Sequence, residues 1–226
     1  MSFLILVRHG KSLWNEENRF TGWTDIDLSN AGIIEAKEAA KKIKKKNIQI
    51  SMAYSSIFSR AHDTCKIILD ELGLSSLQII KDWRINERHY GNLQGLNKKE
   101  TSDLYGKEQV FEWRRNYTTK PPLLEESRFI NDKSLPIFKE IPKNKFPRGE
   151  SLKDTLGRVE VFCKEIIYNS LENEKNILIS AHGNSIRAMI KLFENIDDES
   201  IDKLEVPTGE PIFYKYQSKK LSLIHI

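Results

Sequence analysis

Cysteine is scarce in this sequence, which contains only two, Cys65 and Cys163. Each falls on the apolar stripe of an expected helix. Two cysteines placed in this way indicate neither the disulfide framework of a small secreted domain nor a metal cage. We therefore expect a reducing, cytoplasmic environment.

Long apolar runs are also missing. No stretch approaches the roughly 20 apolar residues that span a bilayer, and the N-terminus lacks a basic region followed by a long apolar core. The sequence therefore predicts no export by an ordinary signal, no anchor and no membrane partner.

Charge of one sign is not in large excess, because 36 Lys and Arg face 32 Asp and Glu. The densest basic run, residues 41–46, lies late in an expected amphipathic helix, where cations suit the helix dipole. We interpret it as a solvated face, with a polyanion site as the less favoured alternative. The mild net charge of +4 suits a small anionic substrate at least as well as nucleic acid, and we expect no nucleic-acid partner.

A hydrophobic fraction of 39% in 226 residues is enough for one sizeable core. Helices are expected to begin at the capping residues Ser29, Ser59, Asn97 and Ser151, with a further helical run around Val110 and Trp113. Strands are expected over residues 3–7, 52–55, 77–80, 176–180, 212–216 and 221–226. This alternation predicts a single α/β domain over residues 1–226, with three layers in which helices flank a mainly parallel central sheet.

Regular patterning fades between Tyr117 and Gly149, a segment that holds five of the seven prolines. A long irregular stretch in a compact domain is usually a functional lid or disordered.

Two of the five histidines share one local setting. His9 and His182 each end an apolar strand and precede a glycine, and ligands of open α/β sheets bind beyond the carboxyl ends of the strands. We expect both imidazoles to face one pocket, whereas His62 and His225 are interpreted as structural. A metal is not expected, because Arg8 beside His9 would repel a cation and no further ligand set is apparent.

Arginines at expected strand and helix ends complete the pattern. Arg8, Arg60, Arg114 and Arg115 offer guanidinium groups that match phosphate and carboxylate geometry. Together with two strand-end histidines they favour phosphoryl chemistry, since a neutral imidazole can attack phosphorus while cations stabilise the spreading charge.

Glu87 is the candidate proton donor for a leaving alkoxide, because it follows the third expected strand at the same sheet edge. A loop carboxylate paired with Arg88 is an equally open interpretation of its spacing.

Several strings across nearly the whole chain resemble the cofactor-dependent phosphoglycerate mutases of the histidine phosphatase superfamily. They are Leu-Val-Arg-His-Gly at 6–10, Asn-Arg-Phe-Thr-Gly-Trp at 18–23, Ser-Arg-Ala at 59–61, Glu-Arg-His-Tyr-Gly at 87–91, Trp-Arg-Arg at 113–115 and Ala-His-Gly-Asn-Ser at 181–185. Arg-His-Gly alone would mark only the superfamily, and the other strings narrow the resemblance to the mutase branch.

The resemblance implies interconversion of 2-phosphoglycerate and 3-phosphoglycerate, in glycolysis and gluconeogenesis, through a phosphohistidine at His9 and a 2,3-bisphosphoglycerate intermediate. It implies priming by 2,3-bisphosphoglycerate, no metal, His182, Arg8 and Arg60 around the transferring group, and Glu87 as acid and base. The implied substrate-binding residues are Arg8, Ser12, Asn15, Thr21, Gly22, Arg60, Glu87, Tyr90, Lys98, Arg114, Arg115, Gly183 and Asn184. The oligomeric state stays open, a homo-oligomer included.

Two departures from the family pattern stand out. Lys11 occupies a position where an acidic residue or glutamine is expected, and it makes the pocket more positive only if it points inward. The sequence ends at Ile226, where several relatives continue into a mobile tail, so we expect lid function of residues 121–147.

Two other functions stay open. One is a phosphatase with the same histidine chemistry that gives the phosphoryl group to water. The other is a module that only binds phosphorylated ligands, against which Glu87 argues, because anion binding needs no carboxylate in a cationic pocket.

Overall fold

A computed structural model describes residues 1–224 and contains one six-stranded sheet. Its strand order is β3-β2-β4-β1-β5-β6. The strands are β1 (Ser2–Arg8), β2 (Met52–Ser55), β3 (Ile79–Lys81), β4 (Ile177–Ala181), β5 (Pro211–Gln217) and β6 (Lys220–Leu223). The first four strands of this order run parallel, and β5 and β6 are antiparallel to their neighbours. The expected mainly parallel α/β sheet is confirmed.

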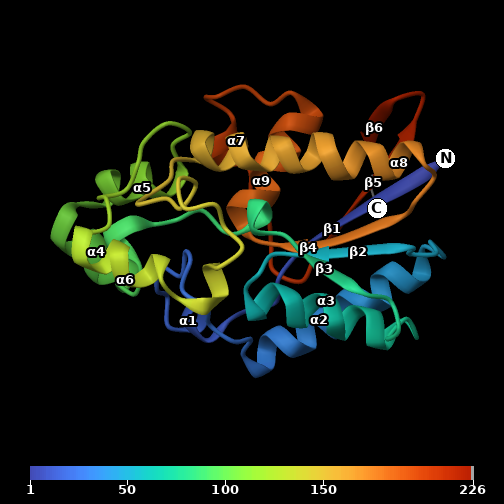
Figure 1. The fold of residues 1–226 in the computed structure, drawn as a ribbon, viewed down its shortest axis with the longest axis horizontal. Coiled ribbons are helices and arrows are strands. Elements are labelled where there is room, and N and C mark those ends of the chain that lie inside the picture. The colour runs from blue at the N-terminus through green and yellow to red at the C-terminus, as the bar shows by residue number, and fades with distance from the viewer. Residues whose placement is uncertain (225–226) are drawn as a thin grey trace.

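Helices cover both faces of the sheet, giving three layers (Figure 1). On one side lie α2 (Asn30–Lys45) and α3 (Ser59–Glu71). On the other lie α7 (Leu152–Phe162), α8 (Asn169–Glu172) and α9 (Gly183–Glu194).

Strand β1 explains why both faces need cover. Leu4 and Leu6 belong to the apolar cluster under α7 and α9, whereas Ile5 and Val7 belong to the cluster under α2 and α3. All four side chains are buried, as expected for a strand between two helical layers.

A second group of helices gathers beyond the carboxyl ends of the parallel strands, at the left of Figure 1. It consists of α1 (Leu13–Glu16), α4 (Lys98–Tyr105), α5 (Lys107–Arg115) and α6 (Glu126–Lys133). Single-turn 3-10 helices link these elements over Trp83–Ile85, Gly91–Leu93, Pro136–Phe138 and Ile201–Lys203. The segments therefore surround the sheet edge at which the candidate site was expected.

Most of the expected helix starts are confirmed. Asn97 caps α4, with its side-chain oxygen accepting from the N–H groups of Lys99 and Glu100. Ser29 and Ser151 cap α2 and α7 in the same way.

Three local expectations need correction. The cap of α3 is Phe58 and not Ser59, whose N–H and hydroxyl groups both donate to Asp25. The third strand is shifted to Ile79–Lys81, and the long helix from Ser151 contains a π-helical segment over Cys163–Tyr168.

The last expected strand is β6, which ends at Leu223. Its expected continuation to Ile226, and the structural role given to His225, lie outside the described residues.

The expectation of an irregular segment between residues 117 and 149 is confirmed for most of its length and wrong over α6 and one 3-10 turn. The segment contains α6 and a 3-10 turn, and Phe138 and Phe146 pack with Trp23 and Phe58 in a buried cluster. Helix α6 has only eight residues and buries none of them, so its pattern is too short to predict a helix from the sequence.

Within residues 1–224, no helix has both the length and the apolar character needed to cross a membrane.

Candidate active site

The two strand-end histidines meet at the carboxyl edge of the sheet. Strands β1 and β4 are parallel neighbours with Arg8 opposite Ala181, so His9 and His182 follow at the same level. Their ring centroids lie 4.9 Å apart in an edge-to-face arrangement. Both side chains are buried.

A close backbone contact fixes the loop that carries His9. A Cβ atom on Gly10 would lie 2.2 Å from the carbonyl oxygen of Gly32 in α2, a distance that no side chain tolerates. The Gly10 N–H also donates to Thr64 Oγ1 of α3 at 3.1 Å. The glycine after His9 therefore serves close approach between loop and helix.

His9 is held as a neutral imidazole. Its Nδ1 lies 2.7 Å from the carbonyl oxygen of Gly10, which can only accept, so Nδ1 carries the proton and Nε2 keeps its lone pair. Burial, and then the nearby charges of Arg60 and Arg8, hold the pKa of His9 well below its usual value.

His182 is held by Ser56, which follows β2 at the same sheet edge. Its Nε2 lies 2.7 Å from Ser56 Oγ, and the Phe58 ring packs against the imidazole at 5.7 Å. Burial, and then Arg60 and His9, lower the pKa of His182. Sequence reasoning missed Ser56, although its place directly after a buried strand was a usable signal.

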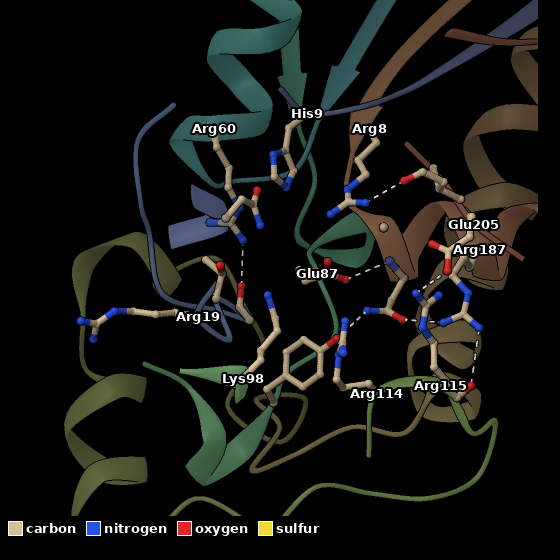
Figure 2. Close-up of a pocket in the computed structure, with 17 residues that line it drawn as sticks. Arg8, His9, Arg19, Arg60, Glu87, Lys98, Arg114, Arg115, Arg187 and Glu205 are labelled. Carbon is tan, nitrogen blue, oxygen red and sulfur yellow. Dashed lines mark hydrogen bonds and ion pairs between the residues drawn. The ribbon is translucent and has the colours of Figure 1, made fainter. Parts of the chain in front are cut away.

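Figure 2 shows Arg8 and Arg60 on either side of His9. Arg60 is fully buried in the first turn of α3 and donates to the carbonyl oxygens of Gly22 and Thr24. Its burial lowers its pKa to about 10, so the guanidinium stays charged at neutral pH. Arg8 donates to Val206 O at 2.7 Å. The Nε atoms of both arginines are buried and lack hydrogen-bond partners within residues 1–224.

Glu87 lies at the N-terminus of α9. Its Oε1 accepts from the N–H of Asn184 at 3.0 Å and from the N–H of Arg88 at 2.8 Å. The Arg88 guanidinium turns away and donates to Tyr90 Oη and Arg114 O. Within the described residues the Arg88 guanidinium bonds to Tyr90 and Arg114 and not to Glu87, which removes the alternative of a carboxylate paired with the Arg88 side chain.

The cavity before these groups has a volume of about 130 Å³. All candidate site residues except Ser12 and His182 line the cavity. They are Arg8, His9, Asn15, Thr21, Gly22, Arg60, Glu87, Tyr90, Lys98, Arg114, Arg115, Gly183 and Asn184. Ser12 is buried as the N-cap of α1, where its Oγ accepts from the N–H of Asn15. His182 lies behind the wall, against His9.

Four lining residues escaped sequence reasoning: Arg19, Arg187, Glu205 and Val206. Arg187 is one helical turn after Gly183 and Asn184, and its Nη1 donates to Asn184 Oδ1 at 3.1 Å. Helical spacing from the His-Gly motif could have found it. Glu205 forms an ion pair with Arg115 at 2.5 Å.

The cavity wall is strongly cationic. Seven lysine and arginine side chains face it against two carboxylates, those of Glu87 and Glu205. Burial lowers the pKa of Lys98. Burial raises the pKa of Tyr90, but the charge and hydrogen bond of Arg88 and the charge of Arg114 together outweigh it, so the pKa is lowered. A small ligand with several negative charges fits such a wall.

Lys11 lies outside this wall. Its side chain is 51% exposed and faces Glu35 at 3.6 Å. The Lys11 side chain therefore points away from the cavity and does not add to its positive charge.

The segment over residues 121–147 contributes no lining residue within the described chain. Its packed aromatic cluster does not fit the role of a mobile lid.

No group of three or more His, Cys, Asp or Glu side chains that could hold a metal occurs in residues 1–224.

Comparisons with known proteins agree with this geometry. The family model of the histidine phosphatase superfamily (branch 1) matches residues 4–145 and 131–226. A Borreliella burgdorferi protein named 2,3-bisphosphoglycerate-dependent phosphoglycerate mutase is 48% identical over 212 residues, 94% of this chain and 86% of its own. A Treponema denticola protein of the same name is 47% identical over 217 residues, with the same shares covered.

Solved structures show the same fold at lower identity. A mycobacterial glucosyl-3-phosphoglycerate phosphatase in complex with VO3 is 22% identical, with a TM-score of 0.76 and 99% of this chain and 98% of its own covered. A phosphoglycerate mutase from Bacillus anthracis is also 22% identical, with a TM-score of 0.72 and 100% and 92% covered.

Proposed function

This chain belongs to the histidine phosphatase superfamily, and we propose that it is a 2,3-bisphosphoglycerate-dependent phosphoglycerate mutase. In this proposal it interconverts 2-phosphoglycerate and 3-phosphoglycerate. The proposal rests on one observation. A neutral His9 with its proton on Nδ1 and the carboxyl group of Glu87 line the same cationic cavity. Relatives with this name at 47% to 48% identity support it.

His9 supplies the nucleophile. The lone pair on Nε2 attacks phosphorus, a P–N bond forms, and the P–O bond to the glycerate oxygen breaks. Arg8, Arg60 and His182 surround this atom and stabilise the charge on the equatorial oxygens. The reverse step passes the phosphoryl group from His9 to a hydroxyl group of phosphoglycerate.

Glu87 supplies and recovers the proton. A departing glycerate oxygen is a poor leaving group unless it is protonated as the P–O bond breaks. Glu87 gives that proton and, as a carboxylate, takes one from the attacking hydroxyl in the reverse step. The two N–H groups that bind its Oε1 hold the carboxyl group in place.

The cavity fits 2,3-bisphosphoglycerate, which supplies the priming phosphoryl group when bound. Figure 2 shows Arg114, Arg115 and Arg187 grouped across the cavity from His9, where they would hold the carboxylate and the second phosphate. The Nε atoms of Arg8 and Arg60, which have no hydrogen-bond partner within residues 1–224, would face the transferring phosphate. The remaining proposed contacts are Asn15, Thr21, Gly22, Tyr90, Lys98, Gly183 and Asn184.

A phosphatase would share the same first step and differ only in the acceptor. The two functions are separated by measuring 2-phosphoglycerate formation and phosphate release from 3-phosphoglycerate, with and without catalytic 2,3-bisphosphoglycerate. We expect isomerisation that depends on the bisphosphate and exceeds phosphate release. Release of phosphate without isomerisation would contradict the proposal and favour the phosphatase, and no reaction would favour a binding module.

A further inference from the structure

A buried ion pair lies behind the loop that carries Glu87. Arg158 of α7 and Glu150 have side chains that are 8% and 6% exposed. Arg158 donates from Nε to Glu150 Oε1 at 2.7 Å and from Nη2 to Oε2 at 2.9 Å. Neither residue belongs to the lining of the active-site cavity within the described chain.

Arg158 also donates to backbone carbonyl groups between Arg84 and Glu87. Nη1 donates to Arg84 O at 2.7 Å and to Asn86 O at 2.9 Å, and Nη2 donates to Glu87 O at 2.9 Å. One guanidinium therefore binds three carbonyl groups of this loop.

Glu150 binds the backbone after Glu87. Its Oε2 accepts from the N–H of His89 at 2.8 Å, and its own N–H donates to His89 O at 2.8 Å. The pair thus holds the loop on both sides of the proposed acid.

The loop has little regular structure of its own to hold it. It follows a single 3-10 turn that ends at Ile85, and the Glu87 carboxyl group is bound by two backbone N–H groups. An acid must lie within hydrogen-bond reach of the oxygen that it protonates, and a misplacement of about 1 Å is costly. A buried ion pair by itself adds little to folding stability. A role in positioning Glu87 therefore explains the Arg158–Glu150 pair better than a role in stability.

We propose that Arg158, together with Glu150, is a positioning residue that sets the efficiency of proton transfer by Glu87. The inference rests on the proposed role of Glu87 in the mutase reaction. It concerns the step in which His9 Nε2 bonds to phosphorus, the P–O bond breaks, and a proton moves from Glu87 to the departing oxygen.

The test compares two phosphoryl donors that phosphorylate His9 with different leaving groups. Glycerate oxygen needs a proton to leave, whereas the phenolate of 4-nitrophenyl phosphate leaves without one. Rapid mixing would follow transfer of label from 2,3-bisphosphoglycerate to His9, and the burst of 4-nitrophenolate would report the same step with the second donor.

Arg158→Lys should slow labelling from 2,3-bisphosphoglycerate by about 10- to 100-fold, because one ammonium cannot bind all these acceptors. The 4-nitrophenolate burst should change by less than about 2-fold, and the KM for phosphoglycerate should stay constant, because Arg158 lies outside the cavity. Glu150→Gln should show the same selective loss and serves if Arg158→Lys does not fold.

The matched control is Arg84→Lys. The Arg84 side chain pairs with Asp82 and Glu165 and contacts neither Glu87 nor His89 within the described residues, so neither rate should change. Equal losses with both donors in the Arg158 and Glu150 variants, or no loss with either, would overturn the inference.

Glu87→Gln separates this failure from failure of the proposed function. That variant should lose the bisphosphoglycerate reaction and keep the 4-nitrophenolate burst. If it loses both reactions equally, the proposed role of Glu87 is wrong, and the positioning inference is overturned with it. If it loses only the first while the Arg158 variants lose neither, the positioning inference alone is wrong.

Discussion

The imidazole of His89, two residues after Glu87, should make this protein sensitive to acid. Its side chain is fully buried, and its Nδ1 accepts from the N–H of Gly91 at 2.9 Å. Burial, and then the charges of Arg128 and Arg158, lower the pKa of His89 from 6.5 to about 3. Protonation would place a cation in this site and break the bond to Gly91.

The size of the effect follows from proton linkage. Between pH 6.5 and about 3, His89 binds a proton in the unfolded chain and not in the folded one. Stability is therefore fully present above pH 6.5 and falls as the pH falls through this window. Each pH unit is worth about 1.4 kcal/mol, so His89 should lower the free energy of unfolding by about 3 kcal/mol at pH 4.5.

The assay is urea denaturation of the wild-type protein and His89→Gln at pH 7.5 and 4.5. At pH 7.5 the variant should be less stable by about 1–3 kcal/mol, because it loses packing and the bond to Gly91. At pH 4.5 this difference should shift by about 3 kcal/mol in favour of the variant. His9 and His182 titrate in both proteins, so their contributions cancel.

His62→Gln is the control, because His62 is only partly buried in α3. Burial, and then Lys81, lower the pKa of His62, but solvent screens the effect and the pH-dependent change should be smaller. A stability difference between the wild-type protein and His89→Gln that is the same at both pH values would refute the reasoning.

Four further predictions address the site. Label from 2,3-bisphosphoglycerate should appear on His9, be lost in mild acid and survive base, and disappear in His9→Ala; label on serine would contradict the proposed nucleophile. Chelators should leave isomerisation intact while vanadate inhibits it, because arginine and histidine stabilise the charge. Activity that a chelator removes and manganese restores would contradict this prediction. Glu205→Gln should lower the KM for phosphoglycerate by about 2- to 5-fold at low salt, because it frees Arg115 and removes a negative charge from the wall; a raised KM would count against this. Gly10→Ala should lower the free energy of unfolding by about 1–3 kcal/mol or more, because the added Cβ would clash with Gly32 O. The control is Gly157→Ala in α7, where the added Cβ meets open space. This variant should be as stable as the wild-type protein or slightly more stable in thermal unfolding.

The sequence by itself determined the features that depend on local chain chemistry. The apolar runs that end at Arg8 and Ala181, the Asn97 cap and the amphipathic helix after Ser151 all formed where the pattern predicted them. Periodicity and capping act within a few residues, so a sequence reveals them directly. The parallel sheet followed from their alternation.

Short segments that bury little of their own surface were decided by tertiary packing. Helix α6 buries none of its residues, and Phe138 and Phe146 are held by Trp23 and Phe58 from distant parts of the chain. Ser59 is the first residue of α3 and not its cap, and Asp25, from a distant part of the chain, accepts from its N–H and hydroxyl groups. Such contacts depend on which segments the fold brings together, which no local pattern specifies.

The site divides in the same way. Strand ends and the family strings identified His9, Arg60 and Glu87 as candidates from the sequence, because chain direction places strand ends at one edge. Only the tertiary structure decided which nitrogen of His9 bears the proton, and that Ser12 caps a helix instead of lining the cavity. These outcomes rest on distances between groups far apart in the chain, and folding alone sets them.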